Sequence, residues 1–163
     1  MASDQWLVSQ FFPQLLGLFP CDSYHIRKSG PALASSMMHP TAARTVRHYR
    51  DLIAWQQAVE LVSNIYRSTR TFPSDERYSL TSQIRRAAVS VPSNIAEGQG
   101  RCSTGEFRQF LGHARGSLLE LETQLIISRD LNYLREDATV QLLSRIAEVG
   151  RILNGLLNAL RDE

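Results

Sequence analysis

The sequence has little of the residue chemistry that most enzymes and metal proteins use. It contains two cysteines, Cys21 and Cys102, and no Cys-x-x-Cys pair, so neither a disulfide framework nor a cysteine zinc site is expected. His113 is the only histidine within the predicted helices, and no Glu-x-x-His pair occurs, so neither a metal cluster nor a catalytic triad can be assembled around it. We therefore expect no enzyme activity, no metal and no cofactor, and the cysteine usage fits a reducing, cytoplasmic location.

An excess of one charge and a long apolar run are also lacking. The formal net charge is only +2, which does not by itself imply nucleic-acid binding. The apolar stretch at residues 6–19 is shorter than the roughly 20 residues that span a membrane, and Pro13 and Gly17 interrupt it. No basic residue precedes this stretch, as a secretory signal would require. The sequence therefore predicts no membrane association.

Residues 1–48 differ in composition from the rest of the chain. After Pro20 they are rich in Ser, Pro, Ala, Arg and His without a sustained periodicity, which is typical of a flexible segment. Met37 and Met38 stand just before the periodic part, and translation starting there would leave most of this segment out of the native protein. We predict a flexible leader over residues 1–48 and a single domain over residues 49–163.

The domain itself carries four segments in which apolar residues recur at steps of three and four, the period of an amphipathic helix. No alternating, β-rich run with turn signals occurs. Short connections between consecutive helices favour antiparallel neighbours, so we predict an all-α fold, an antiparallel up-down four-helix bundle. The predicted helices cover residues 51–70, 80–101, 103–131 and 136–160.

Each predicted helix has an apolar seam that should face the core. In the first it contains Leu52, Trp55, Val59, Val62, Tyr66 and Thr69, widened by Ala58, Leu61 and Ile65. In the second it contains Leu80, Ile84, Ala87, Val91 and Ile95, and in the third Phe107, Leu111, Ala114, Leu118, Leu121 and Leu125. In the fourth it contains Val140, Leu143, Ile146, Gly150, Leu153, Leu157 and Leu160, broadened by Leu142, Val149, Ile152 and Leu156.

Several residues predict where the helices begin, bend and end. Asp51 is a plausible N-cap of the first helix, and residues 103–106 form a capping-box pattern at the start of the third. Pro92 removes a backbone donor inside the second helix, so a kink is expected there. Gly98 and Gly100 are expected to end this helix in left-handed conformation.

A polar line follows one side of the second helix. Its members, spaced by four, three and four residues, are Arg86, Ser90, Ser93 and Glu97, and Arg101 would extend it. One interpretation is a hydrogen-bonded line that fixes helix register or pairs with another subunit. The other is a ligand or phosphate site that uses Arg86, Asn94 and Arg101. We favour the first interpretation and keep the second open.

Arginines also recur on the third helix at multiples of seven residues, so they share one slowly drifting face. They are Arg101, Arg108, Arg115 and Arg129, and Glu122 fills the vacant position. This face would be a phosphate-binding stripe if it contacted nucleic acid, because each neutralised phosphate adds salt-sensitive affinity. It would otherwise be a solvated or intersubunit face that pairs with Glu120, Glu122 and Glu97.

A set of motifs runs through residues 49–160. It consists of Asp51-Leu52, Trp55, Ala58, Phe72-Pro73, Glu76, residues 80–88, 90–98, Arg101, 114–117 and 120–125. These motifs resemble those of a known family, the four-helix bundle proteins that include the 23S rRNA-intervening sequence proteins. The chain is also similar to the accessory variability determinant of diversity-generating retroelements. The resemblance implies a homo-oligomeric ring, typically a pentamer, which in the retroelement relatives binds nucleic acid and a reverse transcriptase.

The predicted function is therefore a non-catalytic, homo-oligomeric scaffold that binds RNA, DNA or a nucleic-acid-handling protein such as a reverse transcriptase. The alternative is a purely structural interaction module whose arginines all serve subunit contacts. The candidate nucleic-acid or interface residues are Arg85, Arg86, Asn94, Glu97, Arg101, Arg108 and Arg115.

Overall fold

The computed structural model describes residues 48–161, so the predicted leader lies outside the described residues except for His48. The described part contains four long helices and no strand, which confirms the all-α prediction. These helices are α2 (Ile53–Ser68), α3 (Leu80–Gln99), α4 (Thr104–Asp130) and α5 (Glu136–Ala159). Short 3₁₀ turns, η2 (Tyr49–Asp51), η3 (Thr69–Thr71) and η4 (Ser74–Tyr78), flank α2 and precede α3.

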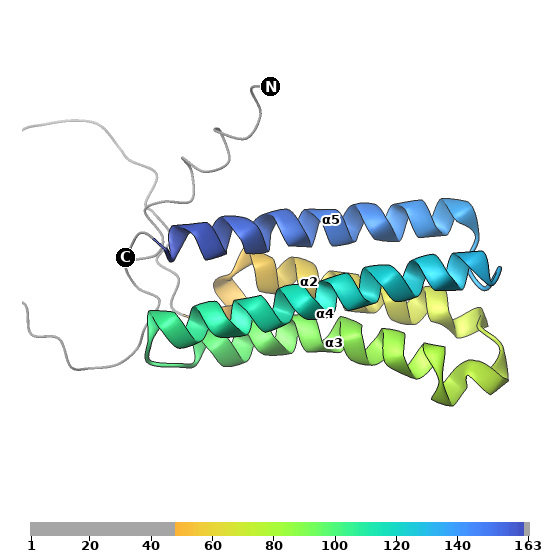
Figure 1. Cartoon of the computed structure of the whole chain (residues 1–163), viewed down its shortest axis with the longest axis horizontal. Coiled ribbons are helices and arrows are strands. Elements are labelled where there is room, and N and C mark those ends of the chain that lie inside the picture. Colours follow the sequence, from red (N-terminus) through yellow and green to blue (C-terminus); the bar gives the residue numbers. More distant parts are fainter. Residues whose placement is uncertain (1–47, 162–163) are drawn as a thin grey trace, which may run out of the picture.

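The four helices lie side by side along the long axis of the molecule (Figure 1). The most extensive packing is between α3 and α4, followed by α2 with α3, whereas α5 contacts both α4 and α2 less extensively. Each helix therefore has two main neighbours, and one apolar core lies between them. No helix in residues 48–161 combines the length and the apolar character that crossing a membrane would need.

The predicted core seams of α3 and α4 are confirmed, except that Leu80 at the start of α3 is only partly buried. Ile84, Ala87, Val91 and Ile95 of α3 are buried, and so are all six predicted residues of α4, from Phe107 to Leu125. The buried apolar residues of each helix recur at steps of three and four, so they share one face that a single rotation about the helix axis turns to the core.

The predicted seams of α2 and α5 are confirmed in part. Val59 and Tyr66 are 37% and 43% exposed, whereas the predicted Leu52, Ala58, Leu61, Ile65 and Thr69 are buried together with Ala54. Val140 is 56% exposed, whereas the predicted Leu142, Ile146, Val149, Leu153 and Leu160 are buried together with Thr139. Apolar residues cover a wide sector of both helices, so the packing partners decide which part of the sector is buried.

The ends of the helices agree with the sequence in part. The Ser103 Oγ accepts a hydrogen bond from the Glu106 backbone N–H at 3.1 Å, as the capping pattern predicted. Asp51 does not cap α2, because its Oδ2 accepts from the backbone N–H of His48 at 3.1 Å inside η2. The N-cap residue of α2 is Leu52, which makes no side-chain cap.

The glycines at the end of α3 do not have the predicted left-handed conformation. Gly100 has φ −74° and ψ −6°, and Gly98 lies buried within the helix, which also runs through Pro92. A Cβ built on Gly98 would lie 2.6 Å from the Phe110 Cβ and 2.9 Å from the Phe107 Cδ2. Gly98 is thus needed for the close approach of α4 rather than for a turn.

We predict that Gly98→Ala destabilises the protein by about 1–3 kcal/mol, because the added methyl group overlaps two phenylalanines in a packed interface. Gly112→Ala is the matched control, since a Cβ at this exposed helical position would meet nothing within 4 Å. Replacing glycine by alanine there should stabilise the helix by about 1 kcal/mol. Urea unfolding followed by circular dichroism measures both changes, and equal stability of the two variants would contradict the prediction.

At the end of the bundle opposite the Gly98 contact, the Glu76 carboxylate links the start of α3 to the segment that follows α4. Glu76 Oε2 accepts hydrogen bonds from the Ser79 hydroxyl and from the Leu80 backbone N–H, and its Oε1 accepts from the Tyr133 hydroxyl at 3.2 Å. These hydrogen bonds, the one from Ser79 foremost, hold the pKa of the Glu76 carboxyl below its ordinary value of 4.5. Tyr133 also packs on Phe72, with ring centroids 5.7 Å apart.

We predict that part of the acid sensitivity of the fold comes from Glu76. Because its pKa is lowered by folding, its contribution to stability is present above 4.5 and is lost as the pH falls through the folded-state pKa. Glu76→Gln should therefore flatten the fall in melting temperature between about pH 6 and about pH 3. Tyr133→Phe removes one hydrogen bond but keeps the ring, and should flatten it less. An unchanged pH profile in Glu76→Gln would refute this role.

Candidate functional site

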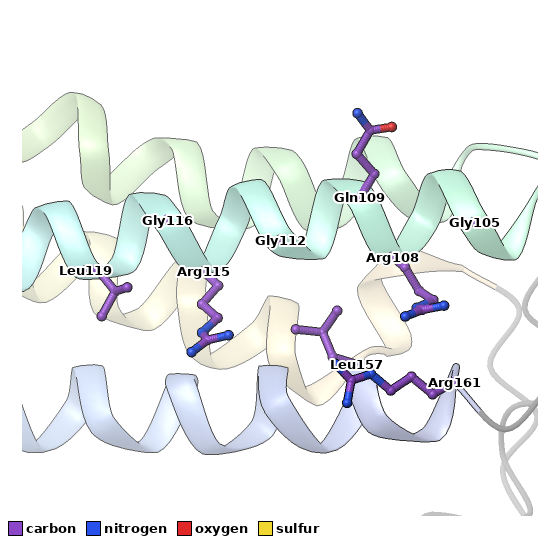
Figure 2. A pocket seen from close by; sticks show the side chains of 9 residues that line it. All are labelled: Gly105, Arg108, Gln109, Gly112, Arg115, Gly116, Leu119, Leu157 and Arg161. Carbon is purple, nitrogen blue, oxygen red and sulfur yellow. The ribbon is translucent and has the colours of Figure 1, made fainter.

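An open groove with a volume of about 620 Å³ lies between α4 and α5. Figure 2 shows the groove from close by, with α4 above it and α5 below. It is lined by Gly105, Arg108, Gln109, Gly112, Arg115, Gly116, Leu119, Leu157 and Arg161. We call this surface the arginine groove.

Three glycines leave the α4 side of the groove without side chains. Gly105, Gly112 and Gly116 are spaced by seven and four residues, which places them along one side of the helix. A Cβ at Gly112 or Gly116 would meet nothing within 4 Å, so the packing of the described residues does not require glycine at either position. The result is open space beside the helix backbone.

Three arginines supply the charge of the groove. Arg108 and Arg115 extend from α4 toward α5, and Arg161 comes from the end of α5 (Figure 2). All three are exposed, and none of their guanidinium groups forms a hydrogen bond or an ion pair within residues 48–161. None of the nine lining residues is acidic.

The chemistry of this arrangement is anion binding. A guanidinium group presents a planar set of donors that matches phosphate and carboxylate oxygens, and it stays charged at every physiological pH. Within the described residues, no group of three His, Cys, Asp or Glu side chains could hold a metal ion.

The other candidate residues are not gathered in the groove. Arg85 donates from Nε to the Thr69 Oγ1 at 3.0 Å and from Nη2 to the Thr69 carbonyl at 3.3 Å, and its guanidinium lies 4.9 Å from the centre of the Tyr66 ring. It therefore ties α3 to the end of α2. Arg86, one residue later, is exposed and has no partner in residues 48–161.

Residues along the polar line of α3 form hydrogen bonds within α3 and to α4. Asn94 Nδ2 donates to the carbonyl and the hydroxyl of Ser90 at 2.9 and 3.0 Å, and Ser117 of α4 donates to the same hydroxyl at 3.0 Å. Glu97 forms an ion pair with Arg101 at 2.6 Å, and the Arg101 guanidinium lies 4.9 Å from the centre of the Phe110 ring. These contacts fit the register interpretation of the line.

The predicted arginine stripe is divided by neighbouring carboxylates. Arg101 pairs with Glu97, and Arg129 pairs with Asp130 at 2.8 Å and Glu136 at 3.8 Å. Only Arg108 and Arg115 of the stripe reach the groove without an acidic partner in the described residues.

Sequence reasoning missed the remaining lining residues. The glycines at 112 and 116 lie on the arginine face of α4, and that coincidence is a signal that could have been noticed. Leu157 and Arg161 come from another helix, so only the packing of α5 against α4 brings them to the groove.

Four helices, an apolar core and an open cationic groove define the class of the protein, a small all-α helical protein with a surface suited to anions. A family model described as 23S rRNA-intervening sequence protein matches residues 50–155. The chain therefore belongs to the 23S rRNA-intervening sequence protein family, as the motifs indicated. Among curated proteins, none matches the sequence.

We predict that Arg85 is a structural residue, unlike its neighbour. Arg85→Ala removes two hydrogen bonds between α3 and the end of α2, and should lower the free energy of unfolding by about 1–2 kcal/mol. Arg86→Ala is the control, because it removes the same charge from an unpartnered, exposed side chain and should change stability by less than about 0.5 kcal/mol. Chemical denaturation of both variants makes the comparison, and equal stabilities would show that the Thr69 contacts contribute nothing.

Proposed function

We propose that the protein is a non-catalytic, homo-oligomeric scaffold that binds nucleic acid, or a nucleic-acid-handling protein such as a reverse transcriptase, through the arginine groove. The observation that carries the proposal is that Arg108, Arg115 and Arg161 line one open groove with no acidic residue among its lining. The cytoplasmic location of this scaffold is likewise a proposal from cysteine usage.

Local charge matters more here than the total. The formal net charge of +2 is small, because basic and acidic residues nearly balance over the whole chain. Unpaired arginines on one surface still create a local positive potential, and each phosphate they neutralise releases counterions. Arg101 and Arg129 contribute less to this potential, since carboxylates lie beside them.

Exposed apolar side chains support the oligomeric part of the proposal. Ile127 of α4, Leu131 just after α4 and Val140 of α5 lie outside the groove and are each between 43% and 56% exposed. Association with further copies of the chain would remove this apolar surface from water. The family resemblance implies a ring, typically of five such bundles. The short connections favour an antiparallel up-down order in each bundle, and Pro92 favours a bend in α3.

The alternative is a structural interaction module without nucleic-acid binding. The exposed apolar residues favour it as well, because they would serve an assembly that needs no further ligand. In this case the arginines of the groove and Arg86 would pair with acidic residues of neighbouring subunits.

We predict that the full-length protein has a mass several times that of its 18.4 kDa chain in light scattering, and that it retards nucleic acid in a mobility shift at low salt. The Arg108→Ala/Arg115→Ala double variant should keep this mass and bind at least tenfold more weakly, since a charge-assisted hydrogen bond contributes about 1.5–3 kcal/mol.

Arg70→Ala/Arg77→Ala is the control for charge, because it also removes two arginines, which are exposed in η3 and η4 and have no side-chain partner in the described residues. It should bind like the wild type. Dissociation of the double variant into monomers would favour the structural module, and no shift by the wild type even at low salt would remove nucleic acid from the proposal.

A further inference from the structure

We infer that the arginine groove is built for the backbone of double-stranded nucleic acid rather than for a single strand. This inference rests on the proposed function and names the kind of nucleic acid that the groove accepts.

The first argument is the lack of a stacking surface. Proteins that bind single strands combine a basic groove with aromatic side chains on which successive bases stack. None of the nine residues that line the arginine groove is aromatic. The phenylalanines nearest in sequence face elsewhere, since Phe107 is fully buried and Phe110 packs on Gly98 beneath Arg101. Unstacked bases would find no aromatic ring in this groove to stack on.

The second argument is the spacing of the charges. Arg108 and Arg115 are seven residues apart on one helix, which separates them by about 10.5 Å along its axis. This distance lies between the widths of the minor and major grooves of B-DNA, about 6 and 12 Å. Two long arginine side chains so placed can reach phosphates on both strands of a duplex. A duplex holds these phosphates at fixed positions, whereas a single strand must be ordered at an entropic cost.

The third argument is the open glycine side of the groove. A glycine inside an exposed helix costs about 1 kcal/mol relative to alanine, and the packing of the described residues requires glycine at neither 112 nor 116. The missing side chains let a wide ridge, such as a sugar–phosphate backbone, lie against α4. Gln109, the single lining amide, points away from Arg108 and Arg115 (Figure 2) and adds no base contact beside them. In this arrangement the arginines are engaged by phosphates rather than by base edges, and phosphate contacts carry no sequence information, so binding should be insensitive to sequence.

The test compares a 20-base-pair DNA duplex, the same duplex as RNA, and the separate single strands by fluorescence anisotropy with the full-length protein. We expect each duplex to bind at least tenfold more tightly than its strands and a scrambled duplex to bind equally well. If three arginines neutralise three phosphates, the logarithm of affinity should fall against the logarithm of salt with a slope of about −2.7. Arg115→Ala should reduce this slope by about 1.

Filling the groove without changing its charge provides a second measurement. Gly112→Leu adds a side chain where a Cβ meets nothing, so the fold should persist while duplex binding falls at least tenfold. Gly155→Leu is the matched control, because a Cβ there also meets nothing within 4 Å and Gly155 does not line the groove. Circular dichroism verifies that both variants fold, and the control should bind like the wild type.

The outcomes separate this inference from the proposed function. Single strands that bind as tightly as duplexes, and lose affinity in Arg115→Ala, would overturn the duplex inference and leave nucleic-acid binding intact. Duplex binding that is unchanged in both Arg115→Ala and Gly112→Leu would overturn the assignment to this groove. A protein that binds none of the four polymers at low salt would overturn both.

Discussion

The contact between α3 and α4 at Gly98 is the constraint on which the rest of the structure depends. Two phenylalanine side chains pack where a Cβ would otherwise lie, which brings the two helix backbones close together. This interface takes up the apolar stripe of α4, from Phe107 to Leu125. The opposite side of α4 is left to glycines and arginines, and α5 packs against it less extensively. The groove thus lies on the face of α4 that does not pack against α3.

The parts of the fold that could be predicted from sequence are those whose pattern allows one solution. On α3 and α4 the steps of three and four identify the buried residues, although Leu119 and Ile127 of α4 are apolar residues outside that stripe. On α2 and α5 the apolar sector is wide, and the choice of Ala58 over Val59, or of Leu142 over Val140, depends on neighbours that a sequence does not show. Gly98 was misinterpreted for the same reason, because a turn glycine and a packing glycine look alike in sequence.

Only the α4 side of the candidate site could be predicted from the sequence, and the α5 side could not. A seven-residue spacing was enough to place Arg108 and Arg115 on one face of α4. That spacing could not show that Arg101 forms an ion pair with Glu97, or that Arg129 forms ion pairs with Asp130 and Glu136. These pairings depend on side-chain positions. Leu157 and Arg161 enter through tertiary packing alone. The groove therefore contains only two of the four arginines in the predicted stripe, because the other two form ion pairs with carboxylates.

The three glycines of α4 have a consequence for the order of folding. Gly105, Gly112 and Gly116 fall within the first half of the helix, where together they weaken its intrinsic helicity by about 3 kcal/mol. A helix this poor in propensity cannot nucleate alone and needs a partner surface. The four residues between α3 and α4 deliver that surface at once, since closing so short a loop costs little entropy. We therefore expect α3 and α4 to form together as the first hairpin, on which α2 and α5 then assemble.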